Sequence, residues 1–222
     1  SFRDGVSREL RGIAPTLAFG IGDNTRIALN AEYFSDERTV DRGIPSYLGK
    51  PLATGRETFF GSADDSFAET EVYSFDALIE HDMGGAVLRN RLRLADYDKF
   101  YQNVYPGAVN SAGNMVSISA YNNLTERENI FNQTDLIFDI NQGDIVHRML
   151  VGAELGRQDT ENFRQTGYFG APGSTVTSQS VSVSNPQPNL PISYRQSASD
   201  ADNAGVADTA ALYVQDQMHI GE

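Results

Sequence analysis

The chain has 222 residues, of which 40% are hydrophobic, with no Trp, no Cys and a formal net charge of -13. No apolar run approaches the roughly 20 residues that a transmembrane helix needs, so a helical membrane protein is excluded. The acidic balance argues against a nucleic-acid partner, which requires clustered Lys and Arg. The lack of Cys removes structural disulfides, thiolate metal sites and a cysteine nucleophile.

Alternation of hydrophobic and polar residues predicts strands along the chain. The first runs over residues 13–21 and ends at the tight turn 22–24, and the second returns over 26–33. Pro15 lies inside the first strand. Because proline cannot donate to a ladder, it indicates an edge strand or a bulge there. A polar, turn-rich stretch follows over residues 35–69.

The next pair of strands is predicted over residues 73–82 and 86–97, joined by a tight turn at Gly84-Gly85. A second long polar segment follows over residues 98–128. We expect this segment to be a long connection between hairpins.

A long hairpin is predicted over residues 129–160, with its turn at Asn141-Gln142-Gly143-Asp144. Its arms alternate over more residues than the ~5–6 of a typical soluble strand. A strand that crosses a bilayer at a tilt needs ~9–11 residues. The hairpin is therefore long enough to span a membrane.

The longest connection covers residues 161–207 and is rich in Ser, Gln, Asn, Gly and Pro. Within it, residues 176–183 and 191–195 are expected to form short strands above the main sheet. A seventh long strand is predicted over residues 212–220.

Tight turns thus alternate with long connections. Loops beyond ~12–15 residues are uncommon in compact soluble domains, whereas transmembrane β-barrels have short periplasmic turns and long extracellular loops. The predicted fold is all-β: an antiparallel, up-and-down transmembrane β-barrel segment with about seven long strands. A soluble β-sandwich is the alternative. In the barrel, the side chains expected to face lipid are Ile13, Leu17, Phe19, Leu29, Phe75, Leu92, Leu136, Phe138, Met149 and Val151.

Three stretches of the chain resemble TonB-dependent ferric-siderophore receptors of Gram-negative outer membranes. They are Gly12-Ile13-Ala14-Pro15-Thr16-Leu17-Ala18-Phe19, Asp41-Arg42-Gly43-Ile44-Pro45-Ser46 and Tyr213-Val214-Gln215-Asp216-Gln217. In that family the second stretch follows a strand and opens an extracellular loop, and the third begins a later strand. The order and spacing of the three stretches make the resemblance more specific than any one of them.

The resemblance implies an N-terminal plug domain, a short segment that contacts TonB, and a barrel of about 22 strands. The chain has about seven predicted long strands, no plug-like segment, and Glu222 where the family ends in an aromatic residue. We therefore expect residues 1–222 to form a partial β-barrel domain, with the plug domain and the C-terminal barrel strands outside this chain. Such a sheet would have two free edges.

The sequence contains no catalytic constellation. His81, His147 and His219 are far apart and lack the spacing of a metal site, and there is no nucleophile elbow. We therefore predict that the protein is not an enzyme and has no catalytic residues and no metal ligands of its own. The resemblance implies that iron is carried inside the siderophore, so no cofactor is expected.

Aromatic residues in the long connections are candidate ligand contacts, because their rings suit a planar catecholate or an apolar siderophore backbone. Alternatively, they pack the loops together or form the aromatic girdle at the membrane edge. The candidates are Tyr101, Tyr105, Tyr121, Tyr168 and Phe169.

Arg89, Arg91 and Arg93 are two residues apart and so share one side of a predicted strand, opposite the leucines expected to face lipid. We therefore expect them to face the lumen. Arg93 is the candidate ligand contact because it is closest to the long loop, and Arg89 and Arg91 are candidate contacts to the plug or the lumen wall. The alternative is a local charge ladder with carboxylates of the preceding strand, at Asp76, Glu80 and Asp82.

The function that the resemblance implies is uptake of a ferric siderophore across the outer membrane, driven through TonB by regions outside this chain. Outer-membrane lipid and lipopolysaccharide are the other expected partners. A passive porin or another outer-membrane barrel is the first alternative, and a soluble β-rich binding domain is the second.

Overall fold

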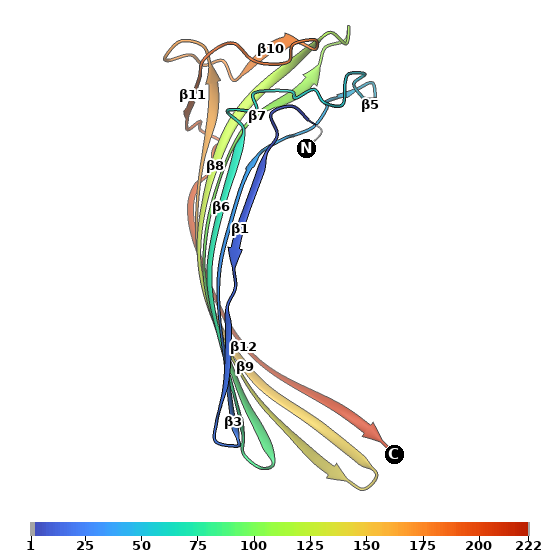
Figure 1. Ribbon diagram of the computed structural model, residues 1–222, viewed down its shortest axis with the longest axis vertical. Helices are drawn as coiled ribbons and strands as arrows, with labels where there is room; N and C mark the ends of the chain where they lie inside the picture. The colour runs from blue at the N-terminus through green and yellow to red at the C-terminus, as the bar shows by residue number, and fades with distance from the viewer. Residues whose placement is uncertain (1–2, 222) are drawn as a thin grey trace.

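The computed structural model describes residues 3–221, so the predicted terminal Glu222 lies outside the described residues. Within this range, no helix is long and apolar enough to cross a membrane. The chain forms one curled antiparallel sheet, with a separate two-stranded β4–β5 ribbon (Figure 1). The long strands are β1 (Arg8–Ile13) and β2 (Thr16–Ile21), then β3 (Thr25–Thr39), β6 (Phe67–Asp82), β7 (Ala86–Val109), β8 (Met115–Gln142), β9 (Ile145–Phe169) and β12 (Asp202–Ile220). The short strands are β4 (Ser46–Tyr47), β5 (Lys50–Pro51), β10 (Ser178–Ser182) and β11 (Ile192–Arg195).

The irregularity predicted at Pro15 is confirmed. The first long strand is divided into β1 and β2, which both pair with β3 on either side of Ala14 and Pro15. Pro15 has no N–H to donate, but its carbonyl oxygen accepts a hydrogen bond from Ala31 N at 3.1 Å. The proline therefore interrupts an edge strand without detaching it from the sheet.

The predicted loop over residues 98–128 is wrong. β7 continues to Val109 and β8 begins at Met115, and the two strands pair as far as Val109–Val116. Both strands pass beyond the hydrophobic zone. There, polar side chains lie on both faces of the sheet, so the hydrophobic alternation that signals a strand is lost. The strict alternation of short and long connections predicted from the sequence therefore fails at residues 110–114.

The connection predicted over residues 161–207 is also shorter than expected, because β9 extends to Phe169 and β12 begins at Asp202. As a result, the Tyr213–Gln217 stretch lies well inside β12 rather than at its start. The two predicted short strands are present as β10 and β11. However, they pair with β8 and β9 and therefore extend the main sheet.

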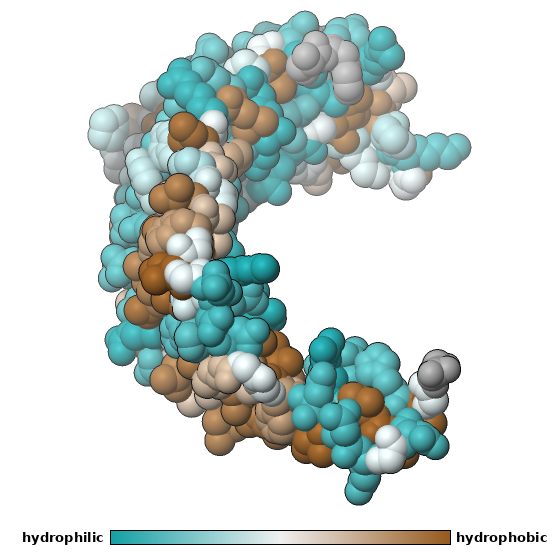
Figure 2. All heavy atoms as spheres, turned by 60° about the horizontal axis from the view of Figure 1, so that its bottom comes forward, coloured by the Kyte–Doolittle hydropathy of each residue, from teal (hydrophilic) through white to brown (hydrophobic). Residues whose placement is uncertain are grey.

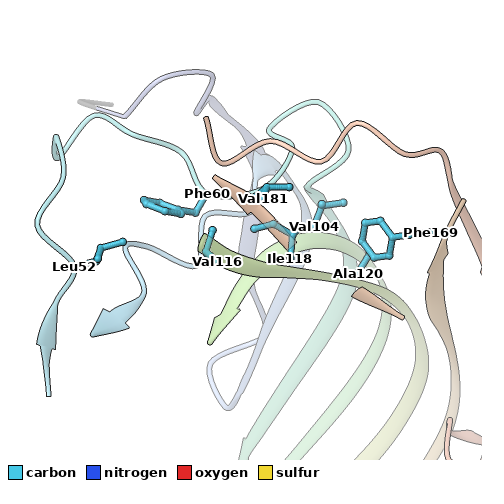
Figure 3. Close-up of a cluster of buried hydrophobic side chains, with 8 residues drawn as sticks. All are labelled: Leu52, Phe60, Val104, Val116, Ile118, Ala120, Phe169 and Val181. Atoms are coloured by element: carbon cyan, nitrogen blue, oxygen red, sulfur yellow. The ribbon is translucent and has the colours of Figure 1, made fainter. Parts of the chain in front are cut away.

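A small hydrophobic core lies at the end of the sheet that carries the long connections, here called the loop end (Figure 3). Residues 40–66 approach the free edge of β7 so closely that a Cβ on Gly61 would lie 1.8 Å from Val104 O. Only glycine permits this contact. The core residues are Leu52, Phe60, Val104, Val116, Ile118, Ala120, Phe169 and Val181.

The two faces of the sheet differ in polarity. Directly paired residues on neighbouring strands point to the same side, and the register places all ten side chains predicted to face lipid on one side. We call this side the apolar face. It also carries exposed hydrophobic residues such as Leu155 and Leu212, and Figure 2 shows hydrophobic residues gathered along the curved sheet. The opposite side, the polar face, carries Arg26, Glu80, Arg89 and Asp135 in one row.

Candidate ligand-binding site

The arginine stripe lies on the polar face, as predicted, and its members differ in their partners. Arg89 Nη2 lies 2.7 Å from Glu80 Oε1, and Arg93 Nη1 lies 3.8 Å from Asp76 Oδ1. Within residues 3–221, Arg91 has no ion pair. The local charge ladder is therefore present for two of the three arginines, which leaves Arg91 as the uncompensated cation of the stripe.

Three of the five candidate aromatic residues lie together at the loop end of the polar face. The ring centroids of Tyr101 and Tyr121 are 5.5 Å apart with an interplanar angle of 84°, and those of Tyr105 and Tyr121 are 5.5 Å apart at 90°. These are edge-to-face contacts, which aromatic pairs prefer. The positions belong to the extended parts of β7 and β8 that the sequence analysis assigned to a loop, so rigid strands hold the cluster.

Arg42 joins the connection between β3 and β6 to this cluster. Its Nε donates to Asn103 Oδ1 at 3.1 Å, its Nη2 donates to the Tyr121 hydroxyl, and its guanidinium lies 5.6 Å from the centroid of the Tyr105 ring. Asn103 is 1% exposed, and its Nδ2 has no hydrogen-bond partner among the residues that the structure describes. Sequence reasoning missed Arg42 as a site residue, although it lies in the Asp41–Ser46 stretch.

Arg164 of β9 closes the cluster from the other side. Its guanidinium lies 4.0 Å from the centroid of the Tyr121 ring, and its Nε lies 3.3 Å from Asp200 Oδ1. Burial by itself would raise the pKa of Asp200, but hydrogen bonds from Ser197 and Thr166 outweigh it and hold the pKa below its usual range. The carboxylate therefore stays charged and fixes Arg164 against the ring.

Tyr101 of this cluster keeps its proton at neutral pH. Burial, and then the hydrogen bond with Tyr121, raise the pKa of Tyr101 to about 12. A neutral phenol can donate a hydrogen bond to an anionic oxygen.

The other two aromatic candidates lie outside the cluster. The guanidinium of Arg195 stacks 3.5 Å from the centroid of the Tyr168 ring, which is 9% exposed. Phe169 is 1% exposed and belongs to the hydrophobic core of the loop end. Its ring therefore packs the loops, which was the alternative role considered for these residues.

Comparison with known proteins gives consistent results for sequence and fold. The chain is 25% identical over 240 residues to a probable TonB-dependent siderophore receptor, PiuA, of Acinetobacter baumannii, and 27% identical over 246 residues to the catecholate siderophore receptor Fiu of Escherichia coli. Each alignment covers 98% of this chain. The crystal structure of A. baumannii PiuA superposes with a TM-score of 0.81 at 21% identity, over 98% of this chain and 34% of that one. No family model matches the sequence.

The chain is homologous to TonB-dependent siderophore receptors. It spans 32% of PiuA and 30% of Fiu, and its sheet corresponds to part of their barrel. The predictions of an all-β barrel segment, of an outer-membrane location in a Gram-negative bacterium and of a non-enzymatic protein class are confirmed through these homologues. In such a barrel the apolar face contacts lipid and the polar face lines the lumen.

Charge is segregated between the two faces of this receptor homologue at its loop end, beyond Tyr33 and Tyr73, whose rings contact each other at a tilt. On the lumen side, cationic side chains outnumber carboxylates. On the outer side, carboxylates outnumber cations, and Arg11 is the one cation there among the described strand residues. The lumen side carries Arg8, Arg38, Lys99, Arg127, Arg164 and Arg195 against Asp36. The outer side carries Glu9, Glu37, Glu69, Glu71, Asp96, Asp98, Glu126, Glu128, Asp159, Glu161 and Asp202.

Proposed function

We propose that this chain is part of an outer-membrane receptor that takes up an anionic ferric siderophore. The observation that carries the proposal is the cluster of Arg42, Arg164, Tyr101, Tyr105 and Tyr121 on the lumen side of the loop end. Neutral phenols and guanidinium groups suit the anionic oxygens of an iron chelate, and the rings offer stacking surfaces for a planar ligand arm.

The segregation of charge supports an anionic ligand despite the net charge of -13. A wall of one sign raises the local concentration of ligands of the opposite sign. The excess carboxylates are on the outer surface of the sheet, so an anion that enters the mouth meets the cationic lumen wall. Fiu, one of the homologues, is a catecholate siderophore receptor by name, and ferric catecholates are the ligands that we favour for this chain.

Transport requires parts of the protein that lie outside this chain. We propose that a plug domain fills the lumen, that a separate segment couples the receptor to TonB, and that further strands close the barrel around the plug. Arg91, which has no ion pair in the described part of the chain, is the stripe residue best placed to contact plug carboxylates. Lipopolysaccharide is the proposed neighbour of the outer face.

The test is binding of a ferric catecholate complex to the complete receptor in detergent. Arg42→Gln removes charge-assisted contacts worth about 1.5–3 kcal/mol, which corresponds to a loss of affinity of about tenfold or more. Arg127→Gln, further down the lumen wall, is expected to weaken binding about two- to fivefold at low salt and less at high salt.

The matched control is Glu126→Gln, which neutralises the adjacent residue on the outer face of β8. We expect this variant to bind like the parent. If Arg42→Gln keeps parental affinity, or if Glu126→Gln changes binding as much as Arg127→Gln, the lumen-side cluster is not the binding site.

A further inference from the structure

The guanidinium of Arg42 is bonded to the sheet along one edge. Its Nε donates to Asn103 Oδ1 at 3.1 Å, and its Nη2 donates to the Tyr121 hydroxyl. In the planar guanidinium the Nε–H and the nearer N–H of Nη2 point in the same direction and form one side of the group. This side of Arg42 therefore faces the sheet.

The other pair of parallel N–H groups on Arg42 is free. Two of the five N–H donors of the guanidinium are used, so three remain, two on Nη1 and one on Nη2. One N–H of Nη1 and the remaining N–H of Nη2 form the terminal fork, which can bind two oxygens at once. Arg42 is exposed, and no residue in the described range 3–221 accepts a hydrogen bond from this fork.

Both acceptors that hold the bonded edge are fixed in place. Asn103 and Tyr121 are directly paired across β7 and β8. The guanidinium of Arg164 stacks 4.0 Å from the centroid of the Tyr121 ring, and Asn103 is 1% exposed. Because the two acceptors belong to rigid, paired strands, they also fix the direction in which the terminal fork of Arg42 points.

The amide of Asn103 is a poor choice for packing alone. Only its oxygen can accept from the Nε–H of Arg42, so this bond fixes the orientation of the amide. Nδ2 is then buried with no partner among the described residues. A buried donor without a partner lowers stability, and residues that break a local rule in this way are expected at functional sites. The unpaired donor therefore favours a role for Asn103 in positioning Arg42.

We propose that Asn103 is a positioning residue that directs the terminal fork of Arg42 toward the ligand. The fork binds two adjacent anionic oxygens on one chelating arm, as a catecholate arm offers. A single oxygen would use only half of the fork, so this geometry selects ligands with paired oxygens. The inference rests on the function proposed above for this site, and it adds which edge of Arg42 binds and which residue orients it.

The test is binding of a tris-catecholate iron(III) complex to the complete receptor in detergent. Asn103→Leu keeps the branching of the side chain but removes the acceptor, so the affinity should fall about three- to tenfold, as for coupled residues of one hydrogen-bond network. In an Arg42→Gln background, Asn103→Leu should cause no further loss, because it acts through Arg42. Asn103→Ala serves in the same comparison if the leucine variant does not fold.

The fork itself is tested by Arg42→Lys. Lysine keeps the positive charge but has no fork, so we expect this variant to bind about three- to tenfold more weakly than the parent.

The matched control is Asn122→Leu. Asn122 is 7% exposed, its Nδ2 donates to Gln165 Oε1 at 3.2 Å, and it follows Tyr121 in β8 and so points to the opposite face. This variant should bind the iron complex like the parent.

The outcomes separate this inference from the function on which it rests. Parental affinity in Arg42→Gln would overturn the binding site and this inference together. If Arg42→Gln weakens binding, three results would overturn this inference alone. They are parental affinity in Asn103→Leu or in Arg42→Lys, an equal loss from Asn103→Leu in both backgrounds, and a loss in Asn122→Leu as large as that in Asn103→Leu.

Discussion

The ring of Tyr213 covers Gly152 on the lumen face of the sheet. The two residues are directly paired across β9 and β12, and a Cβ on Gly152 would lie 2.2 Å from Tyr213 Cε2. The Tyr213 hydroxyl donates to Asp135 Oδ1 at 2.5 Å. This bond fixes the far end of the ring, so the ring cannot move away from a larger side chain without losing its partner.

We expect Gly152→Ala to destabilise the barrel by about 1–3 kcal/mol, the usual cost of overpacking. The measurement is urea unfolding of the complete receptor in lipid bilayers. Gly205→Ala in β12 is the control, because a Cβ at Gly205 meets no atom of residues 3–221 within 4 Å. In a Tyr213→Ala background the ring is absent, so Gly152→Ala should destabilise the barrel much less than it does in the parent. If Gly152→Ala destabilises the Tyr213→Ala variant as much as the parent, the backbone conformation at residue 152, and not the contact with the ring, requires glycine.

The orientation of β9 is tested by neighbouring residues that point to opposite faces. Leu155 lies on the apolar face, 63% exposed, and Glu154 lies on the lumen face. An arginine facing lipid near the midplane costs about 2–4 kcal/mol, so Leu155→Arg should impair folding into bilayers far more than Glu154→Arg. Equal losses would mean that the two faces are assigned the wrong way round. Asp135 and Gly152 are unsuitable as lumen controls, because Asp135 is 5% exposed and both contact Tyr213.

Asp200 gives the loop end a defined dependence on pH. Its carboxylate accepts hydrogen bonds from Ser197 N at 2.9 Å and Thr166 Oγ1 at 2.8 Å. These bonds hold the folded-state pKa below the ordinary value near 3.9, against the opposing effect of burial. A depressed pKa contributes stability that is complete above the unfolded-state value and is lost as pH falls through the folded-state value.

We therefore expect the segment around Asp200 to stay ordered from pH 8 down to about 5 and to loosen below about 4. Hydrogen exchange at the Ser197 amide, corrected for intrinsic rates, measures this change. Asp200→Asn should weaken protection at pH 7 by about 1–3 kcal/mol, since it removes the charged acceptor, and should also abolish the pH dependence. Loosening near pH 6 in the parent would instead point to a histidine elsewhere.

The sequence by itself determined the membrane-spanning part of this protein. Within a bilayer one face of each strand must be apolar, so alternation identified the strands, the tight turns and all ten lipid-facing side chains from Ile13 to Val151. The same physics explains the failure over residues 98–128. Beyond the membrane, backbone pairing holds β7 and β8 together with no demand on side-chain polarity, and the pattern no longer reports the strand.

Only the tertiary structure decided the site. The cluster joins Arg42, Tyr121 and Arg164, which come from three separate parts of the chain, and no local pattern records that β8 brings them together. Likewise, the sequence located the arginine stripe, but the register showed that Glu80 and Asp76 neutralise two of its members and leave Arg91 without an ion pair in the described chain. Side-chain chemistry is local in the sequence, whereas the distances that determine binding and charge compensation depend on how distant strands are paired.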